Sequence, residues 1–184
     1  LVTGVQTCAL PILGAKTAQT PYLFFLNNDT VLKDGWSTPL LNLLENDSTV
    51  AATSPLLLYP DQTVQHTGIV FTMRGPIHIY RYFPASHPLL AKERSFQALT
   101  AAALMVRRNL FLKVNGFYEE YKNGFEDVDL CLRLQNLGYK LISTSKAIIY
   151  HLESQSAGRN DAIYTNSILL KKRCGHMYRV DLHI

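Results

Sequence analysis

Three groups of polar residues in this sequence have the types and positions to do chemistry together. The segment NNDT at 27–30 follows an apolar run, Glu126 and Asp127 stand where a helical pattern begins, and His151 follows another apolar run. One carboxylate and one imidazole can hold a divalent cation and leave room for phosphate oxygens and water. These ligands suit Mn²⁺ or Mg²⁺, and the imidazole favours Mn²⁺. A second carboxylate outside the metal shell can act as general base on an acceptor hydroxyl, and Asp127 is the candidate.

Each group also has a purely structural explanation. Asp29 can close a turn or cap a helix. The acids at 126–129 can complement a helix dipole, and Asp129 is also placed to pair with Arg133 four residues on. His151 can be a histidine whose hydrogen bonds are satisfied at the edge of a core. None of the groups establishes a site when it is taken alone.

The elements that must position these groups alternate between strands and helices, which predicts a single α/β domain with ligands at the carboxyl ends of its strands. Continuous apolar runs such as YLFFL suit strands covered on both faces, as in a parallel sheet flanked by helices. Glu126–Leu137 is the clearest helix, because acids stand in its first turn and Gly138 supplies a stop. Residues 60–95 are rich in Pro, His and Tyr and indicate a β-rich excursion. The other expected elements are strands over Tyr22–Leu26, Val50–Tyr59, Phe96–Val106, Tyr139–Ile142 and Ala147–Tyr150, and helices over Gly14–Thr20, Trp36–Asn46, Arg107–Val114 and Ile163–Arg173.

Three segments, in this order and spacing, resemble the inverting glycosyltransferases of family 2. The segments are FLNNDT at 25–30, NGFEDVDLCLRLQNLGYKL at 123–141 and IIYHLESQSAGR at 148–159. The resemblance runs from about Leu13 to Arg159 and includes VQHTGIVF at 64–71 and TAAALMVRRNLFLKVNGF at 100–117. It implies the nucleotide-diphospho-sugar transferase (GT-A) fold, a Rossmann-like α/β fold with a mostly parallel sheet flanked by helices.

The resemblance also implies a role for each matching residue. Asp29 and His151 would bind the metal that bridges the diphosphate, with His151 placed 24 residues beyond Asp127 as in the family. Asp127 would accept the acceptor's proton as that oxygen attacks the anomeric carbon from the face opposite the leaving nucleotide. Glu126 would orient the acceptor or the base. The outcome is transfer with inversion.

The resemblance assigns Asn27, Asn28 and Asp29 to donor binding. Asn27 stands where many relatives have the first Asp of an Asp-x-Asp-like motif. A neutral amide can hydrogen-bond the ribose or a metal-bound water, but it adds no charge to the site.

Composition narrows the class of protein. The 184 residues are 47% hydrophobic and 17% charged, and there is no uninterrupted apolar run long enough to span a bilayer. Three widely spaced cysteines fit neither a disulfide framework nor a paired metal site, which favours a reducing cytoplasm. Of the net charge of +4, +3 lies from Arg159 onward. The cluster Lys171, Lys172 and Arg173 fits a solvated helix face or peripheral contact with anionic lipid at the inner face of the plasma membrane, and nothing else suggests nucleic-acid binding.

The first residues resemble something other than protein. Residues 2–12, VTGVQTCALPI, resemble the translation of a short-read sequencing adapter. We therefore expect three regions: adapter-derived residues 1–12, a partial glycosyltransferase domain over 13–159, and a basic C-terminal helix and tail over 160–184. On this reading the chain lacks the first βαβ strands of the fold, and we expect it to be an inactive or unstable fragment of a natural enzyme.

The expected function is transfer of a sugar from a nucleotide-diphospho-sugar donor to a glycan or lipid-linked glycan acceptor. The resemblance suggests cell-surface polysaccharide synthesis, such as a rhamnosyl-type transfer. Two alternatives stay open, a non-catalytic module that binds sugar nucleotides and a metal-dependent hydrolase that uses Asp29 and His151 to activate water. The hydrolase is disfavoured because the sequence has no HExxH motif or second histidine cluster.

Overall fold

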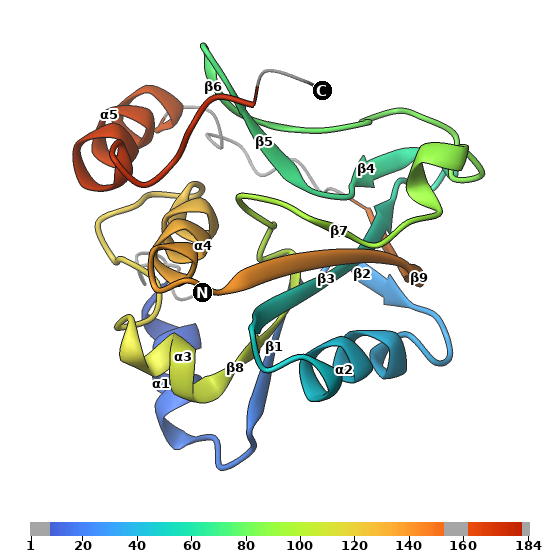
Figure 1. The fold of residues 1–184 in the computed structure, drawn as a ribbon, viewed down its shortest axis with the longest axis horizontal. Coiled ribbons are helices and arrows are strands. Elements are labelled where there is room, and N and C mark those ends of the chain that lie inside the picture. Colours follow the sequence, from blue (N-terminus) through green and yellow to red (C-terminus); the bar gives the residue numbers. More distant parts are fainter. Residues whose placement is uncertain (1–7, 153–161, 182–184) are drawn as a thin grey trace.

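A computed structural model describes residues 8–152 and 162–181 of the chain (Figure 1). Within this part a seven-stranded sheet has the central order β1-β8-β3-β9-β2, with β4 added beside β3 and β7 beside β9. The strands of this sheet are β1 (Tyr22–Leu26), β2 (Thr30–Leu32), β3 (Val50–Leu58), β4 (Val64–His66), β7 (Arg94–Ser95), β8 (Ala103–Arg107) and β9 (Lys140–His151). The hairpin of β5 (Ile69–Thr72) and β6 (Gly75–His78) forms a separate two-stranded sheet. The helices are α1 (Ala9–Thr17), α2 (Ser37–Asn46), the 3₁₀ turn η1 (Pro88–Leu90), α3 (Arg108–Lys113), α4 (Glu126–Asn136) and α5 (Ile163–Cys174).

Helices cover both faces of the sheet. In Figure 1, α2 lies on one side of the strands, and α1, α3 and α4 lie on the other. The side chains of β8 alternate accordingly, since Met105 packs in the cluster with Leu40 and Leu44 of α2, and Leu104 and Val106 pack in the cluster with α4. The expected α/β class, with a central sheet flanked by helices, is confirmed. β1 departs from the expected burial, because of its residues only Leu23 is buried.

The strand directions correct the expected mostly parallel sheet. β3 and β9 are parallel, whereas β1 with β8, β8 with β3, and β2 with β9 are antiparallel. A continuous apolar run reports burial on two faces and carries no information on strand direction. The excursion over 59–102 brings the chain back to the carboxyl end of β3, where it began. β8 therefore starts at that end and runs antiparallel to β3.

Two expected boundaries also change. The strands expected over Tyr139–Ile142 and Ala147–Tyr150 are one strand, β9, which continues across an irregularity where the partner of β3 jumps from Thr144 to Ile148. The strand expected over Phe96–Val106 begins only at Ala103, and the residues before it form an irregular segment. The β-rich excursion between 60 and 95 is confirmed by β4 to β7.

The N-terminal elements extend the expected helix backwards. α1 begins at Ala9 rather than Gly14, and Ile12 packs against the main core cluster. Residues 1–7 lie outside the described residues, and the adapter origin of residues 1–12 stays a prediction. The proposed boundary near Arg159 also lies outside them. No helix in the described part of the chain is long and apolar enough to cross a membrane.

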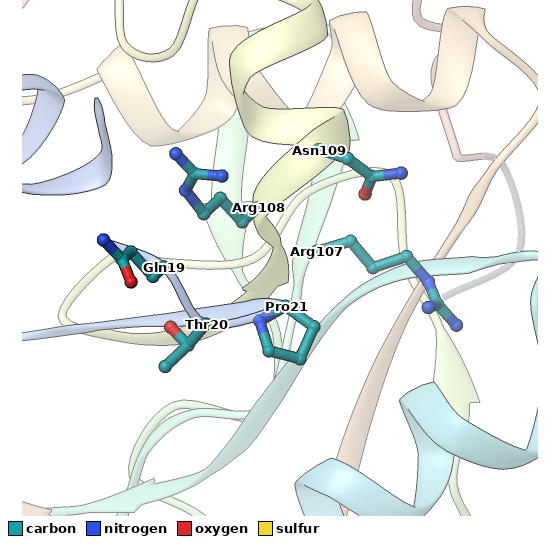
Figure 2. A pocket seen from close by; sticks show the side chains of 6 residues that line it. All are labelled: Gln19, Thr20, Pro21, Arg107, Arg108 and Asn109. Atoms are coloured by element: carbon teal, nitrogen blue, oxygen red, sulfur yellow. The ribbon is translucent and has the colours of Figure 1, made fainter. Parts of the chain in front are cut away.

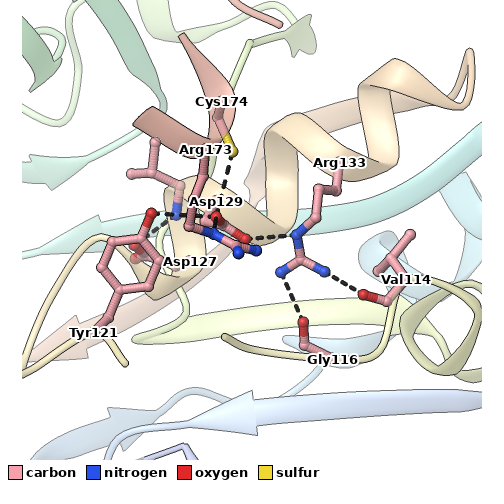
Figure 3. Close-up of polar contacts among 9 residues, drawn as sticks. Val114, Gly116, Tyr121, Asp127, Asp129, Arg133, Arg173 and Cys174 are labelled. Atoms are coloured by element: carbon pink, nitrogen blue, oxygen red, sulfur yellow. Dashed lines mark hydrogen bonds and ion pairs between the residues drawn. The ribbon is translucent and has the colours of Figure 1, made fainter. Parts of the chain in front are cut away.

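A buried carboxylate joins α4 to α5. Asp129 is fully buried and accepts hydrogen bonds from Arg133 Nε at 2.5 Å, Arg173 Nε at 2.8 Å and Tyr121 Oη at 3.2 Å (Figure 3). The expected pairing with Arg133 is confirmed, and the link to Arg173 on α5 is one that helical spacing could not reveal. Burial alone would raise the pKa of Asp129, but the hydrogen bond from Arg173 and the charge of Arg133 lower it overall. Asp129 therefore stays ionised and fixes the helix that begins with Glu126.

We expect Asp129→Ala to destabilise the chain by about 3 kcal/mol, because two arginines lose their buried partner. The control Lys140→Ala breaks an exposed pair with Asp47 and should leave the unfolding curve unchanged. The stabilisation from a lowered pKa is present above the ordinary carboxyl value of 3.8 and is lost as pH falls through the folded value. The free energies of unfolding of wild type and Asp129→Ala should therefore converge as the pH falls into the acid range. Equal stability at neutral pH in urea unfolding would contradict this account.

Candidate active site

One edge of the sheet, the one at which the carboxyl ends of β1 and β9 lie, brings the expected site residues together. β1 and β9 point in the same direction, so the residues after β1 and the end of β9 lie at the same edge. His151 Nε2 lies 3.0 Å from Asp29 Oδ1 and 3.3 Å from Asn27 Nδ2. His151 is the last residue of β9 and is buried, whereas Asp29 is half-buried and Asn27 is exposed. The expected proximity of these residues is present in the structure.

The NNDT segment holds this geometry through its backbone. It turns the chain from β1 into β2, which pairs with the end of β9 so that Thr30 stands opposite His151. Thr30 Oγ1 donates to the Asn27 carbonyl at 2.8 Å, and Leu152 N donates to the Asp29 carbonyl at 2.8 Å. The turn that the structural explanation of Asp29 required is therefore present, and it is the same turn that presents Asp29 to His151. Asn28 lies exposed in this turn.

The irregular segment before β8 connects Asp127 to the same edge. Ala101 N donates to Asp127 Oδ2 at 3.1 Å, and the carbonyl of the next residue, Ala102, accepts from Asn27 N at 2.9 Å. Val128 N donates to the other carboxylate oxygen, Asp127 Oδ1, at 2.8 Å. Two adjacent residues thus separate the Asp127 carboxylate from the NNDT turn. This support was missed in the sequence because these residues read as the interior of a strand.

Glu126 begins α4 and folds back on the loop before it. Its Oε2 accepts from Gly124 N at 2.8 Å, and both Glu126 and Asp127 are half-buried. The preceding Phe125 has a positive φ of 76°, a conformation that non-glycine residues adopt infrequently. The turn that starts the helix is therefore held by a carboxylate from the helix itself.

A glutamine that the sequence analysis did not single out contacts His151 at Nδ1, the ring nitrogen that faces away from Asp29. Gln65 Oε1 lies 2.6 Å from His151 Nδ1, and Gln65 Nε2 donates to the His151 carbonyl at 3.3 Å. Gln65 is buried on β4, within the segment VQHTGIVF that the resemblance includes without assigning a role to any of its residues. Two adjacent polar residues, Gln65 and His66, beside the apolar run of β5 are the signal that could have found it, because polar groups inside a fold are retained where they have partners.

A pair of histidines lies behind the Ala101–Ala102 segment. His66 Nδ1 lies 2.9 Å from His78 Nδ1, and Thr100 N donates to His66 Nε2 at 3.4 Å. Burial, and then the neighbouring His78 and His151, hold the pKa of His66 well below its ordinary value, so His66 is neutral and a structural acceptor. His66 and His78 stand 12 residues apart in the sequence and meet through the contact of β4 with β6.

The donor set fits a divalent cation that takes its remaining ligands from outside the chain. No cluster of three or more histidine, cysteine or acidic side chains that could hold a metal occurs among residues 8–152 and 162–181. Two ligand atoms at right angles, each about 2.1 Å from an ion, are about 3 Å apart. The observed separation of His151 Nε2 and Asp29 Oδ1 is 3.0 Å. The pair can therefore act as neighbouring ligands of one ion, with the other positions left to phosphate oxygens and water.

A hollow of about 350 Å³ lies at the opposite edge of the sheet (Figure 2). Its two arginines bind backbone carbonyls: Arg107 donates to Val50 and Leu44, and Arg108 donates to Ala15. They satisfy carbonyls in the last turns of α1 and α2 and at the start of β3, which is a structural role. The residues that line the hollow are Gln19, Thr20, Pro21, Arg107, Arg108 and Asn109.

Comparison with solved structures defines the class of fold. The crystal structure of GalNAc-T7 with UDP, GalNAc and Mn²⁺ superposes with a TM-score of 0.64 and 15% sequence identity, covering 87% of this chain and 33% of that one. The chain therefore has the GT-A glycosyltransferase fold. The sequence model of a family described as the N-terminal domain of galactosyltransferase matches residues 85–155, a range that includes Asp127 and His151.

Three curated proteins are similar to this chain in sequence. The chain is 33% identical over 143 residues to an uncharacterized protein of Sinorhizobium fredii, covering 74% of this chain and 16% of that protein. It is 35% identical over 156 residues to the O-antigen biosynthesis protein RfbC of Myxococcus xanthus, covering 81% of this chain and 12% of RfbC. It is 28% identical over 153 residues to the N-acetylglucosaminyl-diphospho-decaprenol L-rhamnosyltransferase of Mycobacterium tuberculosis, covering 77% of this chain and 50% of that protein.

These findings agree with one another. The family match, the O-antigen biosynthesis and rhamnosyltransferase relatives and the solved neighbour all make this chain similar to GT-A nucleotide-sugar transferases. The chain spans half or less of the length of each of these curated relatives. The narrower assignment to family 2 stays a prediction, as do the limits of the three regions.

We expect His151→Ala and Asp29→Asn each to weaken Mn²⁺ binding by more than about tenfold, because each removes one of two protein ligands. Binding is measured by electron paramagnetic resonance of free Mn²⁺ in the presence of UDP, which supplies diphosphate oxygens. Asp47→Asn, an exposed carboxylate on the loop after α2, is the matched control and should bind as wild type does. Unchanged affinity in both site variants would rule the pair out as the metal ligands.

Proposed function

We propose that this chain carries the metal-binding and base residues of an inverting glycosyltransferase that moves a sugar from a nucleotide-diphospho-sugar to an acceptor hydroxyl. The observation that carries the proposal is the junction at one edge of the sheet. Asp29 and His151 lie 3.0 Å apart there, and Asp127 is joined to the same turn through Ala101 and Ala102. A cation ligand pair and a separate carboxylate are what displacement of a diphosphate by a hydroxyl requires.

The proposed step is a single displacement. Asp127 accepts the proton of the acceptor hydroxyl while that oxygen forms a bond to the anomeric carbon. The bond between the anomeric carbon and the diphosphate oxygen breaks, its electron pair leaves with the nucleotide diphosphate, and the configuration inverts. Asp29 and His151 would hold Mn²⁺ or Mg²⁺, whose charge stabilises the departing diphosphate.

The remaining residues would position the reactants. The hydrogen bond from Ala101 N keeps one oxygen of Asp127 in place, so the carboxylate has a fixed direction of approach. Glu126 holds the turn in front of α4 through Gly124, which supports orientation of the acceptor or the base. Asn27 and Asn28 are exposed in the turn and can donate to ribose or phosphate oxygens.

The names of the relatives support an acceptor class. One relative is an O-antigen biosynthesis protein, and another is a rhamnosyltransferase whose name gives a diphospho-decaprenol acceptor. We therefore propose a glycan or lipid-linked glycan acceptor, a rhamnosyl-type donor and a role in cell-surface polysaccharide synthesis. A lipid-linked acceptor would place the enzyme in the cytoplasm beside the inner face of the plasma membrane.

The base assignment is tested by Asp127→Asn, assayed in the natural protein that contains this chain. The amide keeps an oxygen that can accept from Ala101 N, but it cannot take a proton from the acceptor. We expect kcat to fall by at least about 100-fold with donor affinity unchanged. Asp61→Asn, in the exposed turn after β3, is the control. Unchanged transfer in Asp127→Asn would refute the role.

The same assay separates the alternatives. Product with inverted anomeric configuration, detected by proton NMR, supports the transferase. Donor cleavage that does not depend on an acceptor would favour the hydrolase, and donor binding with neither reaction would favour a non-catalytic module.

We propose that one exposed face of α5 makes peripheral contact with the membrane. Tyr164 and Ile168 of α5 are 75% and 51% exposed, and the exposed Lys171 and Lys172 follow at helical spacing on the same face. Arg173 does not belong to this face, because it binds Asp129. Exposed apolar and basic side chains on one helix face suit a surface of anionic lipid.

We expect the double variant Lys171→Glu, Lys172→Glu to lose more than about tenfold in affinity for vesicles that contain phosphatidylglycerol, with no change for neutral vesicles. Lys16→Glu, Lys113→Glu makes the same change in charge on α1 and α3 and is the control. Sedimentation with vesicles measures both. Equal losses in the two double variants would indicate net charge alone, and no loss in either would contradict the α5 surface.

A further inference from the structure

We propose that Gln65 is a positioning residue that fixes the tautomer of His151, so that the Nε2 lone pair faces Asp29. The inference rests on the proposed function, since it concerns the same ligand pair, and deepens it by assigning a residue that prepares the pair for a cation. The structural basis is a two-point contact in which one amide side chain binds both the ring and the backbone of His151.

Gln65 is held firmly enough to impose an orientation. It is the central residue of β4, which pairs antiparallel with β3 through Leu58 with Val64 and Leu57 with His66. The side chain of Gln65 is 6% exposed, so water has little access to compete for its amide. A buried amide bound on both of its polar atoms has no alternative rotamer that keeps both hydrogen bonds.

The backbone carbonyl of His151 decides which way the amide of Gln65 points. A carbonyl oxygen only accepts, so the group of Gln65 that lies 3.3 Å from it must be the NH₂ group. The amide oxygen then faces His151 Nδ1 at 2.6 Å. The flipped amide would place two acceptor oxygens against each other at the carbonyl, so the contact with the carbonyl excludes it.

The amide in turn decides where the proton of the imidazole lies. Oε1 of Gln65 only accepts, so Nδ1 of His151 must carry a hydrogen. In the neutral ring the lone pair is therefore on Nε2, which lies 3.0 Å from Asp29 Oδ1 and 3.3 Å from Asn27 Nδ2. Two acceptors at 3.0 Å repel unless a proton or a metal cation lies between them, and in the neutral ring that leaves the metal cation. Gln65 thus sets the pair in the state that binds a cation, with Asn27 as a donor to the same nitrogen.

The test compares Gln65→Met, which keeps length and burial but removes the acceptor, with Gln65→Glu, which keeps an acceptor at Nδ1. Long-range ¹H–¹⁵N NMR of the histidine rings reports the tautomer in the metal-free chain at alkaline pH, where the imidazoles are neutral. Electron paramagnetic resonance reports Mn²⁺ affinity in the presence of UDP. Gln135→Met removes a similar hydrogen bond, to the Phe96 carbonyl, away from the site and is the control.

We expect the wild-type ring of His151 to carry its hydrogen on Nδ1, and Gln65→Met to shift the ring toward the Nε2–H form. Mn²⁺ affinity should fall about 10- to 100-fold in Gln65→Met. Gln65→Glu should keep the Nδ1–H form and bind Mn²⁺ more tightly than Gln65→Met does, and Gln135→Met should match wild type.

A wild-type ring in the Nε2–H form would overturn the inference without any variant, so the test survives a variant that fails to fold. Gln65→Met with the wild-type tautomer and affinity would overturn it as well. The tautomer is measured without metal, so it remains informative if His151→Ala and Asp29→Asn leave Mn²⁺ binding unchanged. That result would remove the metal proposal, while the tautomer would still decide the role of Gln65.

Discussion

The parallel pairing of β3 with β9 is the constraint on which the rest of the molecule depends. It gives β9 the same direction as β3 and β1. His151, the last residue of β9, therefore lies at the edge where the chain leaves β1. β2 then closes that edge by pairing with the last residues of β9. Polar residues that follow apolar strands are brought together by strand direction alone, and their side chains need only short turns to meet. The candidate site is a consequence of this arrangement.

The second requirement is that α4 begins at the right place relative to that edge. Asp129, one turn into the helix, is buried between Arg133 and Arg173, and the hydrogen bonds of the two arginines outweigh the cost of burying its charge. On the opposite face of this first turn, Asp127 accepts a hydrogen bond from Ala101 N. The first turn of α4 is therefore fixed both at its buried face and at the face toward the site, which supports a base with a defined direction.

The sequence predicted the residues of this edge better than it predicted the sheet. A polar segment after an apolar run, and acids at a helix start, are local signals. The residues they indicated lie near one another in the structure, with Asp29 beside His151 and Asp127 joined to the same turn, while their roles stay predictions. Strand direction is not a local property and cannot be read from a single apolar run. The prediction of a mostly parallel sheet was therefore wrong. The break expected within β9 coincides with a register shift between two strands, which one strand alone cannot reveal. Gln65 was missed because its role depends on a partner 86 residues away.

We propose that Asp29, His151 and Asp127 belong to one site at this edge of the sheet. Anomalous X-ray scattering from crystals of the protein grown with Mn²⁺ and UDP tests it most directly. We expect a manganese peak within coordination distance of both Asp29 Oδ1 and His151 Nε2, with the diphosphate on the side of Asp127. Manganese bound elsewhere, for example at the hollow between Gln19 and Asn109, with none at the Asp29–His151 pair, would contradict it.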